Sequence, residues 1–131
     1  YAPPPTASNF FTLTPCRVLD TRNATGPLGG PALGANSTRV FTVTGICGIP
    51  STAKAISANL TVALPTATGT LSVYPGNAFP FNATAMNYKT GQTRANNAMV
   101  MLATDGSGSF GIQNAAPAAV HFLLDVNGYF E

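Results

Sequence analysis

Charged residues are scarce in this sequence of 131 residues: Asp, Glu, Lys and Arg together make up 8%, and the net charge is +2. An average soluble domain carries about 25% charged residues. The few basic residues are scattered, so they form no patch for nucleic acid and no basic amphipathic helix for a membrane surface. We therefore expect no nucleic-acid partner and no direct membrane insertion. Weak charge repulsion permits close self-association.

Residues able to transfer protons are also few, with one histidine and four acidic residues. His121 and Asp125 share a strand face but are separated by about 13 Å at roughly 3.3 Å per residue, too far for a hydrogen bond. Asp20 precedes a loop and is expected to accept backbone N–H bonds there, and Asp105 begins a glycine-rich turn in which Asp is favoured. No nucleophile-elbow pattern is present. We predict that the chain is not an enzyme.

Metal ligands are equally sparse. One histidine and two cysteines cannot build a zinc site. Asp125 with Asn127 is the best local pair for calcium, which takes carboxylate and carbonyl oxygens. No dense acidic loop surrounds them, and an ion pair of Asp125 with Arg22 or Arg94 is the preferred explanation. We expect no cofactor, with calcium as the alternative.

Glycine (13) and proline (11) are frequent and evenly spread, and no window shows a helical apolar period. Strand-like alternation is common instead. The segments that favour strands are residues 10–14, 17–19, 39–43, 55–64, 70–74, 84–88, 97–103, 109–113 and 119–130. They predict an all-β fold, an antiparallel β-sandwich of jelly-roll type with about nine strands.

Two of these segments alternate clearly, which assigns their faces. The predicted inward side chains of the first are Ile56, Ala58, Leu60, Val62 and Leu64. Those of the second are Val120, Phe122, Leu124, Val126 and Phe130, with Tyr129 facing outward. Residues 97–103 are apolar on both faces, which predicts a central strand or one that meets another subunit. The turns at residues 65–69 and 105–108 predict hairpins.

The two cysteines, Cys16 and Cys47, predict one disulfide in a secreted chain, with two reduced buried thiols as the alternative. The sequence starts at Tyr1 without an initiator Met, which is typical of a processed chain. We expect a secreted, extracellular or cell-surface protein. We divide it into an extended N-terminal segment (residues 1–14) and a single β-sandwich domain (residues 15–131).

The N-terminal segment combines a proline-rich start with an apolar stretch at residues 10–14. An extended segment of this kind can add to an exposed sheet edge of a neighbour. Phe11 and Leu13 would fill pockets on one face and Phe10 on the other, giving a homo-oligomer or homopolymer. The alternative is that residues 10–14 form the first strand of their own sandwich.

Two features concern glycans. Asn-x-Ser/Thr sequences occur at Asn23, Asn36, Asn59 and Asn82, which makes glycosylation a prediction. Tyr74, Tyr88 and Tyr129 are candidates for a sugar-stacking platform, since tyrosine rings stack against sugars. The alternative is that these tyrosines cap strand ends.

Four motifs together carry a resemblance. They are residues 15–22 (PCRVLDTR), 47–50 (CGIP), 91–97 (GQTRANN) and 125–130 (DVNGYF). From about residue 10 to 130 the chain resembles a broad family of secreted bacterial surface domains. The resemblance implies an exported, β-rich bacterial protein and supplies no activity. We therefore expect a non-enzymatic extracellular structural protein that assembles into a filament or layer through its N-terminal segment. The alternative is a carbohydrate-binding or adhesion module.

Overall fold

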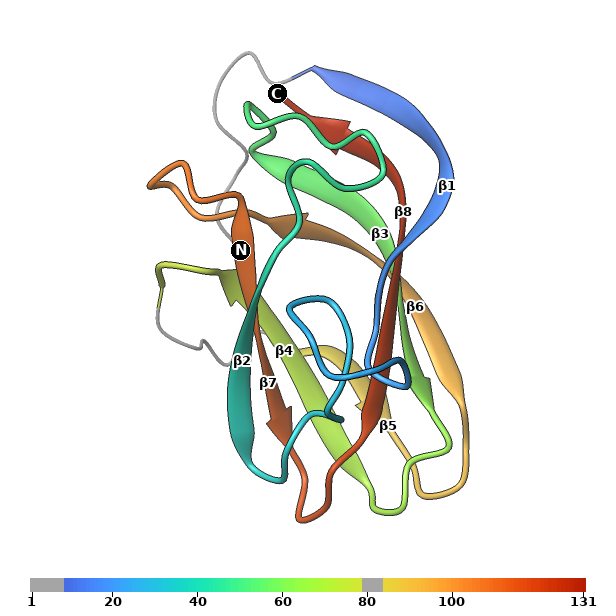
Figure 1. The fold of residues 1–131 in the computed structure, drawn as a ribbon. Helices are drawn as coiled ribbons and strands as arrows, with labels where there is room; N and C mark the ends of the chain where they lie inside the picture. Colours follow the sequence, from blue (N-terminus) through green and yellow to red (C-terminus); the bar gives the residue numbers. More distant parts are fainter. Residues whose placement is uncertain (1–8, 79–83) are drawn as a thin grey trace.

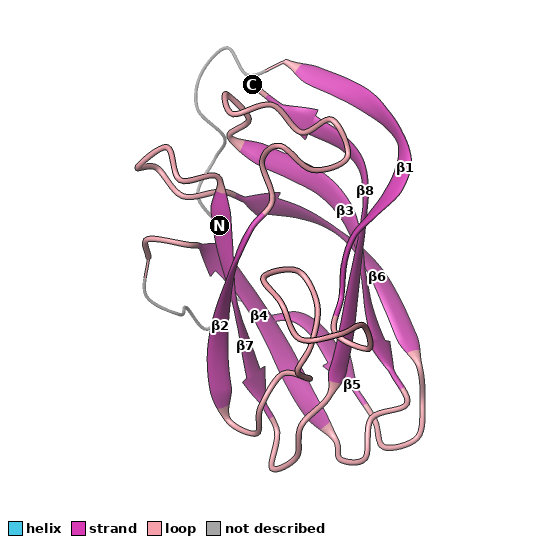
Figure 2. Ribbon diagram, viewed as in Figure 1, coloured by secondary structure: helices cyan, strands magenta, loops and turns pink. Residues whose placement is uncertain are grey.

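The computed structural model describes residues 9–78 and 84–131, which form eight β-strands and no helix (Figures 1 and 2). The strands are β1 (Phe10–Asp20), β2 (Ser37–Thr42), β3 (Ala55–Ala63), β4 (Gly69–Pro75), β5 (Thr84–Tyr88), β6 (Arg94–Met101), β7 (Ser109–Ala115) and β8 (His121–Phe130). In the described ranges there is accordingly no helix that could cross a membrane. The predicted glycosylation site Asn82 and residues 1–8 of the predicted N-terminal segment lie outside these ranges.

The strands form two four-stranded antiparallel sheets that face each other (Figure 1). Sheet I has the order β1-β8-β3-β6, and sheet II has the order β2-β7-β4-β5. The pairing is nested: β1 pairs with β8, β2 with β7, β3 with β6 and β4 with β5. This is the pattern of an antiparallel ribbon rolled into two layers, the eight-stranded jelly roll. The predicted all-β jelly-roll sandwich is confirmed.

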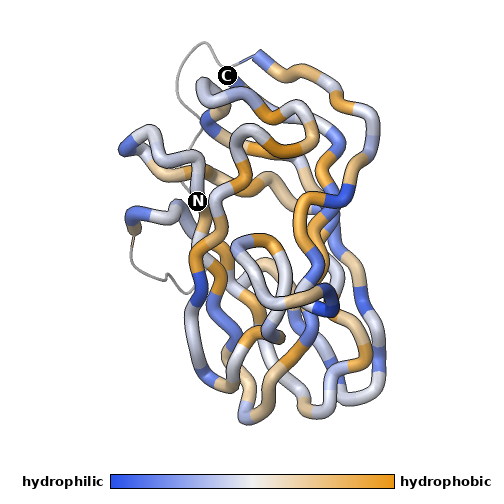
Figure 3. Tube along the Cα trace, in the orientation of Figure 1, coloured by the Kyte–Doolittle hydropathy of each residue, from blue (hydrophilic) through white to orange (hydrophobic). Residues whose placement is uncertain are grey.

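The core lies between the sheets, where apolar side chains from alternate strand positions meet. Along the chain, hydrophobic and hydrophilic residues alternate in the strands (Figure 3). Phe41 of sheet II contacts Phe110 in its own sheet and Phe122 in sheet I, with ring centroids 5.7 and 6.5 Å apart. All three rings are fully buried. Such aromatic contacts add to the free energy gained from burial and join the two layers.

The structure has eight strands where about nine were predicted, because two of the predicted strands belong to a single strand. Residues 10–14 and 17–19 belong to β1, which runs through Pro15 without ending. Proline lacks a backbone N–H, and an edge strand tolerates this because one side has no ladder to complete. The strand also runs through the predicted boundary between residues 14 and 15. The structure shows no break in the domain there.

Three further expectations about the strands are wrong. Residues 65–69 and 105–108 join strands of different sheets, so neither turn closes a hairpin. Residues 97–103 do not form a central strand, because β6 lies at an edge of sheet I; the alternative, that this strand meets another subunit, stays a prediction. Period-two alternation identifies a strand and its buried face, but it does not say which sheet the next strand joins.

The face prediction for β3 holds up to Val62 and fails at Leu64. The inward positions from Ile56 to Val62 are fully buried. Leu64 follows the end of the strand with a φ of 42° and is 72% exposed. A left-handed residue turns the chain out of the strand, so the alternation cannot continue through it.

Candidate assembly site on the N-terminal edge strand

Strand β1 forms an edge of sheet I, with β8 on one side and no described strand on the other. Its N-terminal half pairs with β8 through Phe10↔Phe130, Phe11↔Tyr129 and Thr12↔Gly128. The pairing extends one residue beyond the strand: the Asn9 N–H donates to the Glu131 carbonyl at 2.8 Å, and the Glu131 N–H donates back at 3.1 Å. These residues therefore form the first strand of their own sandwich, which is the alternative stated above for residues 10–14.

Phe10 lies on the outer face of sheet I and is 48% exposed. Its ring packs against Phe130, with centroids 4.9 Å apart, and crosses the neighbouring backbone of Gly128. A Cβ added to Gly128 would lie 2.5 Å from two ring carbons of Phe10. A glycine in a strand often marks such a close approach. Gly128 therefore makes the slot in which the Phe10 ring lies.

Phe11 is 40% exposed and stacks on Tyr129, with centroids 5.3 Å apart and ring planes inclined by 21°. The predicted faces of Tyr129 and Phe130 are reversed: Tyr129 packs against the core, and Phe130 pairs with Phe10 on the outer face. The cause is a β-bulge in β8. Ser57 pairs with Gly128 and Ala58 with Val126, which leaves one extra residue in β8 and shifts the alternation.

The third predicted assembly residue, Leu13, is half-buried and packs against the edge of the core. One of its methyl carbons lies close to Gly48, at 3.4 Å from the position of an added Cβ. The structure thus keeps Phe10, Phe11 and Leu13 near one another on one strand. Whether they contact a neighbouring copy stays a prediction.

The disulfide between Cys16 and Cys47 is formed, with Cα atoms 5.8 Å apart. It joins the middle of β1 to the connection between β2 and β3, so it links sheet I to the segment that arrives from sheet II. The prediction of one disulfide is confirmed. The cross-link lies where the pairing of β1 with β8 resumes, since the next pair after Thr12↔Gly128 is Cys16↔Val126.

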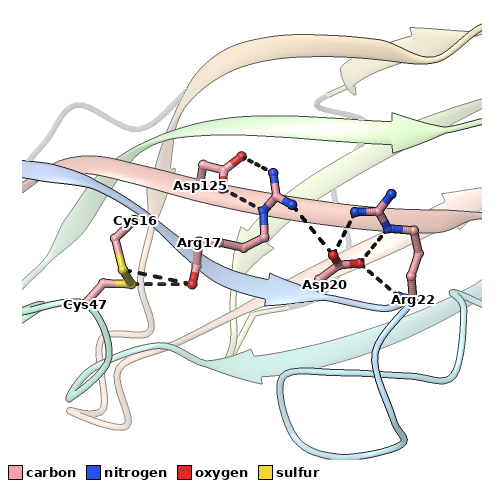
Figure 4. Close-up of polar contacts among 6 residues, drawn as sticks. All are labelled: Cys16, Arg17, Asp20, Arg22, Cys47 and Asp125. Carbon is pink, nitrogen blue, oxygen red and sulfur yellow. Dashed lines mark hydrogen bonds and ion pairs between the residues drawn. A yellow bond between two sulfur atoms is a disulfide. The ribbon is translucent and has the colours of Figure 1, made fainter.

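Beyond the disulfide, a row of ion pairs fixes the second half of β1 (Figure 4). Arg17 donates to Asp125 through Nε (2.9 Å) and Nη2 (3.3 Å), and its Nη1 lies 3.7 Å from Asp20. Arg22 donates to Asp20 from its backbone N–H (3.0 Å), its Nε (3.0 Å) and its Nη2 (2.9 Å). The hydrogen bonds from Arg22 lower the pKa of Asp20 against the opposing effect of burial, and the bond to Asp125 raises the pKa of Arg17.

This row corrects the predicted partner of Asp125, which is Arg17 and neither Arg22 nor Arg94. Arg17 lies directly opposite Asp125 in the β1–β8 register, a proximity that the sequence spacing does not reveal. The expectation that Asp20 accepts a backbone N–H is confirmed. In the described ranges no cluster of three or more His, Cys, Asp or Glu side chains could hold a metal ion.

The three tyrosines proposed as a sugar platform do not form one. Tyr74 and Tyr88 are buried in sheet II, whereas Tyr129 packs in sheet I. The Tyr88 hydroxyl donates to Asn114, whose amide in turn donates to the Gly34 and Ala118 carbonyls at 3.0 and 3.1 Å. Burial raises the pKa of both buried phenols. Alternation places a tyrosine on a face without saying how deeply the opposite sheet covers it.

The predicted glycosylation sites lie at three kinds of position. Asn23 and Asn36 are exposed in loops, Asn59 is half-buried in β3, and Asn82 is outside the described residues. Glycosylation stays a prediction. His121 is exposed and has its Nδ1 at 3.0 Å from the hydroxyl oxygen of Thr21.

Two residues of the site were missed in the sequence. Gly128 and Phe130 complete the slot for Phe10, although Phe130 was assigned to the interior. The signal was present: a glycine followed by two aromatic residues inside an otherwise regular strand marks either a bulge or a close backbone approach. Here it marks both.

Together the fold and the site define a disulfide-bonded jelly-roll domain with an aromatic edge strand. No family model matches the chain, and no curated protein is significantly similar in sequence. Among solved structures, the chain is similar to the coat protein of Tobacco streak virus. The coat protein dimer at 2.4 Å gives a TM-score of 0.43 and 13% identity over 94% of this chain and 86% of that chain. A second crystal form gives the same score and identity over 93% and 88%. A likeness at this level carries no inference about function.

Proposed function

We propose that this chain is a non-enzymatic structural protein of the bacterial surface or its secreted matrix, which assembles into a filament or layer through the first half of β1. One observation carries the proposal. Among the described residues, four large apolar side chains are exposed, and two of them, Phe10 and Phe11, are adjacent on the same open edge. The disulfide and the resemblance to exported bacterial domains support an extracellular location.

The other three sheet edges support this choice of surface. Native proteins discourage edge-to-edge association with charged residues and proline. Strand β2 carries Arg39, β6 carries Arg94, and β5 is followed directly by Lys89. Residues 10–14, which form the first half of β1, carry neither charge nor proline, and Asn9 before them is likewise uncharged. Strand β5 and residues 95–101 of β6 share this lack of charge and proline, but among the described edge strands only the first half of β1 exposes two large apolar side chains, so pairing with another chain gains most there.

The exposed area of the two rings is enough to matter. An aromatic side chain offers about 200 Å², so their exposed fractions leave roughly 90 Å² of each ring uncovered. At about 25 cal/mol per Å², covering both rings contributes about 4 kcal/mol of association free energy. That corresponds to roughly a thousandfold in the association constant. The low net charge adds little repulsion against it.

Sedimentation velocity over a range of concentrations tests the proposal. The unaltered chain is expected to sediment as large species, and Phe10→Ser with Phe11→Ser is expected to be mainly monomeric. Val40→Ser is the matched control because Val40 is 52% exposed on an edge strand of sheet II. It should assemble like the unaltered chain. A monomeric unaltered chain, or a double variant that assembles equally well, would overturn the proposal.

A further inference from the structure

The two halves of β1 are attached to the domain in different ways. Residues 10–12 pair with β8, and pairing resumes only at Cys16↔Val126. Residues 13–15 lie between these two paired stretches, and a single residue of β8, Asn127, lies opposite them. Pro15 has no N–H to donate. The first half of β1 is therefore joined to the second by a short segment outside the ladder.

The disulfide stands at the end of this segment. Cys16 is covalently tied to Cys47, and the buried core residues of β1 begin at Val18. Residues 9–15 include no buried side chain, and their apolar members are exposed or half-buried. The first half of β1 can therefore leave β8 without opening the core, because the cross-link holds the rest of the strand in place.

Departure of this half-strand would uncover a specific receptor. The receptor consists of the Gly128 slot, the rings of Tyr129 and Phe130, and the backbone N–H and carbonyl of Glu131. Residues 9–14 of a second copy have the same shape and hydrogen-bonding groups as the half-strand that has left, so they fit this receptor. The Phe10 ring of the incoming segment fills the slot at Gly128, so no other side chain is needed there.

We propose that residues 9–14 are exchanged between copies, so that the half-strand of each copy pairs with β8 of the next. The inference rests on the proposed function and adds the partner and the mode of contact. An exchange that runs in one direction from copy to copy produces an open filament, whereas a reciprocal exchange closes a dimer. The slot and ladder contacts are the same in the closed and exchanged forms. The free energy that favours exchange therefore comes from covering the exposed parts of the two rings where adjacent copies meet, and concentration shifts the balance further toward exchange.

Cysteine pairs can detect the exchange. Asn9 and Glu131 exchange both backbone hydrogen bonds, so the next pair, Phe10 and Phe130, is the non-hydrogen-bonded kind. The Cα atoms of such pairs are about 4.5 Å apart, which is within the range of a disulfide. Two single variants, Phe10→Cys and Phe130→Cys, would be mixed before assembly and oxidised afterwards. Neither chain can form this bridge by itself.

The expected result is a covalent Phe10→Cys to Phe130→Cys dimer on a non-reducing gel, which requires the two residues to come from different chains. The matched control mixes Asn59→Cys with Asn97→Cys, which face each other in β3 and β6 within one domain, and it should give no covalent dimer. Assembly without the covalent dimer would overturn strand exchange and leave the proposed function standing. An unaltered chain that never assembles would overturn both.

A second variant covers the case in which the single variants do not assemble. The doubly substituted chain, Asn9→Cys with Glu131→Cys, keeps both rings and is oxidised as a dilute monomer so that the half-strand is locked onto its own β8. Asn9 and Glu131 exchange both backbone hydrogen bonds, and the Cα atoms of such a pair are about 5.5 Å apart, within the range of a disulfide. The locked chain is expected to stay monomeric at concentrations at which the Asn59→Cys, Asn97→Cys double variant assembles. A locked chain that assembles as readily as that control would refute the exchange.

Discussion

Removal of the disulfide should lower the stability of the domain by a predictable amount. Cys16 and Cys47 are 31 positions apart, so the cross-link closes one loop of that length in the unfolded chain. On the chain-entropy relation, closing such a loop contributes about 3.7 kcal/mol at 25 °C. The half-buried cysteines leave little cavity when replaced by serine. The loss should therefore come mainly from the unfolded state.

The predicted loss can be converted into a shift in melting temperature. At about 2.1 cal/mol/K per residue, the entropy of unfolding of 131 residues is about 275 cal/mol/K, so the melting temperature should fall by about 13 °C. Scanning calorimetry of Cys16→Ser with Cys47→Ser measures it, at one fixed low concentration because self-association adds stability. Val40→Ser, inside the same loop, is the control for substitution alone.

A small shift would refute this reasoning. If the double serine variant melts within about 3 °C of the unaltered chain, the cross-link does not restrict the unfolded chain as assumed. The disulfide would then be a poor anchor for β1, and the independence of its first half would lose its physical basis. A fall near the predicted value supports an anchor at Cys16.

Three further predictions concern single residues. Gly128→Ala places a Cβ 2.5 Å from the Phe10 ring, so the ring must leave its slot and sedimentation should show weaker assembly; unchanged assembly would contradict the slot. Tyr88→Phe leaves the buried Asn114 oxygen without its hydroxyl donor, and urea unfolding should show a loss of about 1–3 kcal/mol, against no loss if the bond is unimportant. The lowered pKa of Asp20 contributes stability that is present above about pH 4 and is lost as the pH falls through the folded-state value, so Asp20→Asn should remove part of the acid dependence of unfolding; an identical pH profile would exclude that contribution.

The fold class was predictable because the burial pattern is strong and local. From Ile56 to Val62 every second side chain is buried, as the alternation requires. The strand count failed at Pro15, because a proline that would end a central strand is tolerated on an edge. The sheet to which each strand belongs depends on the nested pairing of distant segments, which no local period contains.

The candidate site was predictable in part. The apolar stretch at residues 10–14 predicted a strand with outward apolar side chains, and Phe10 and Phe11 are exposed there; assembly through them stays a prediction. The receptor half was missed because a bulge in β8 exchanges the faces of Tyr129 and Phe130, whereas the face assignment continued a strict alternation through Gly128. The partner of Asp125 likewise depends on the register between the first and last strands, which the sequence spacing cannot supply.

The central claim is that separate copies of this chain join through the first half of β1. Negative-stain electron microscopy of the purified chain at increasing concentration tests it most directly. Regular threads or sheets should form from the unaltered chain and should be absent from Phe10→Ser with Phe11→Ser at the same concentration. Isolated particles from the unaltered chain at every concentration, or the same threads from both proteins, would contradict the claim.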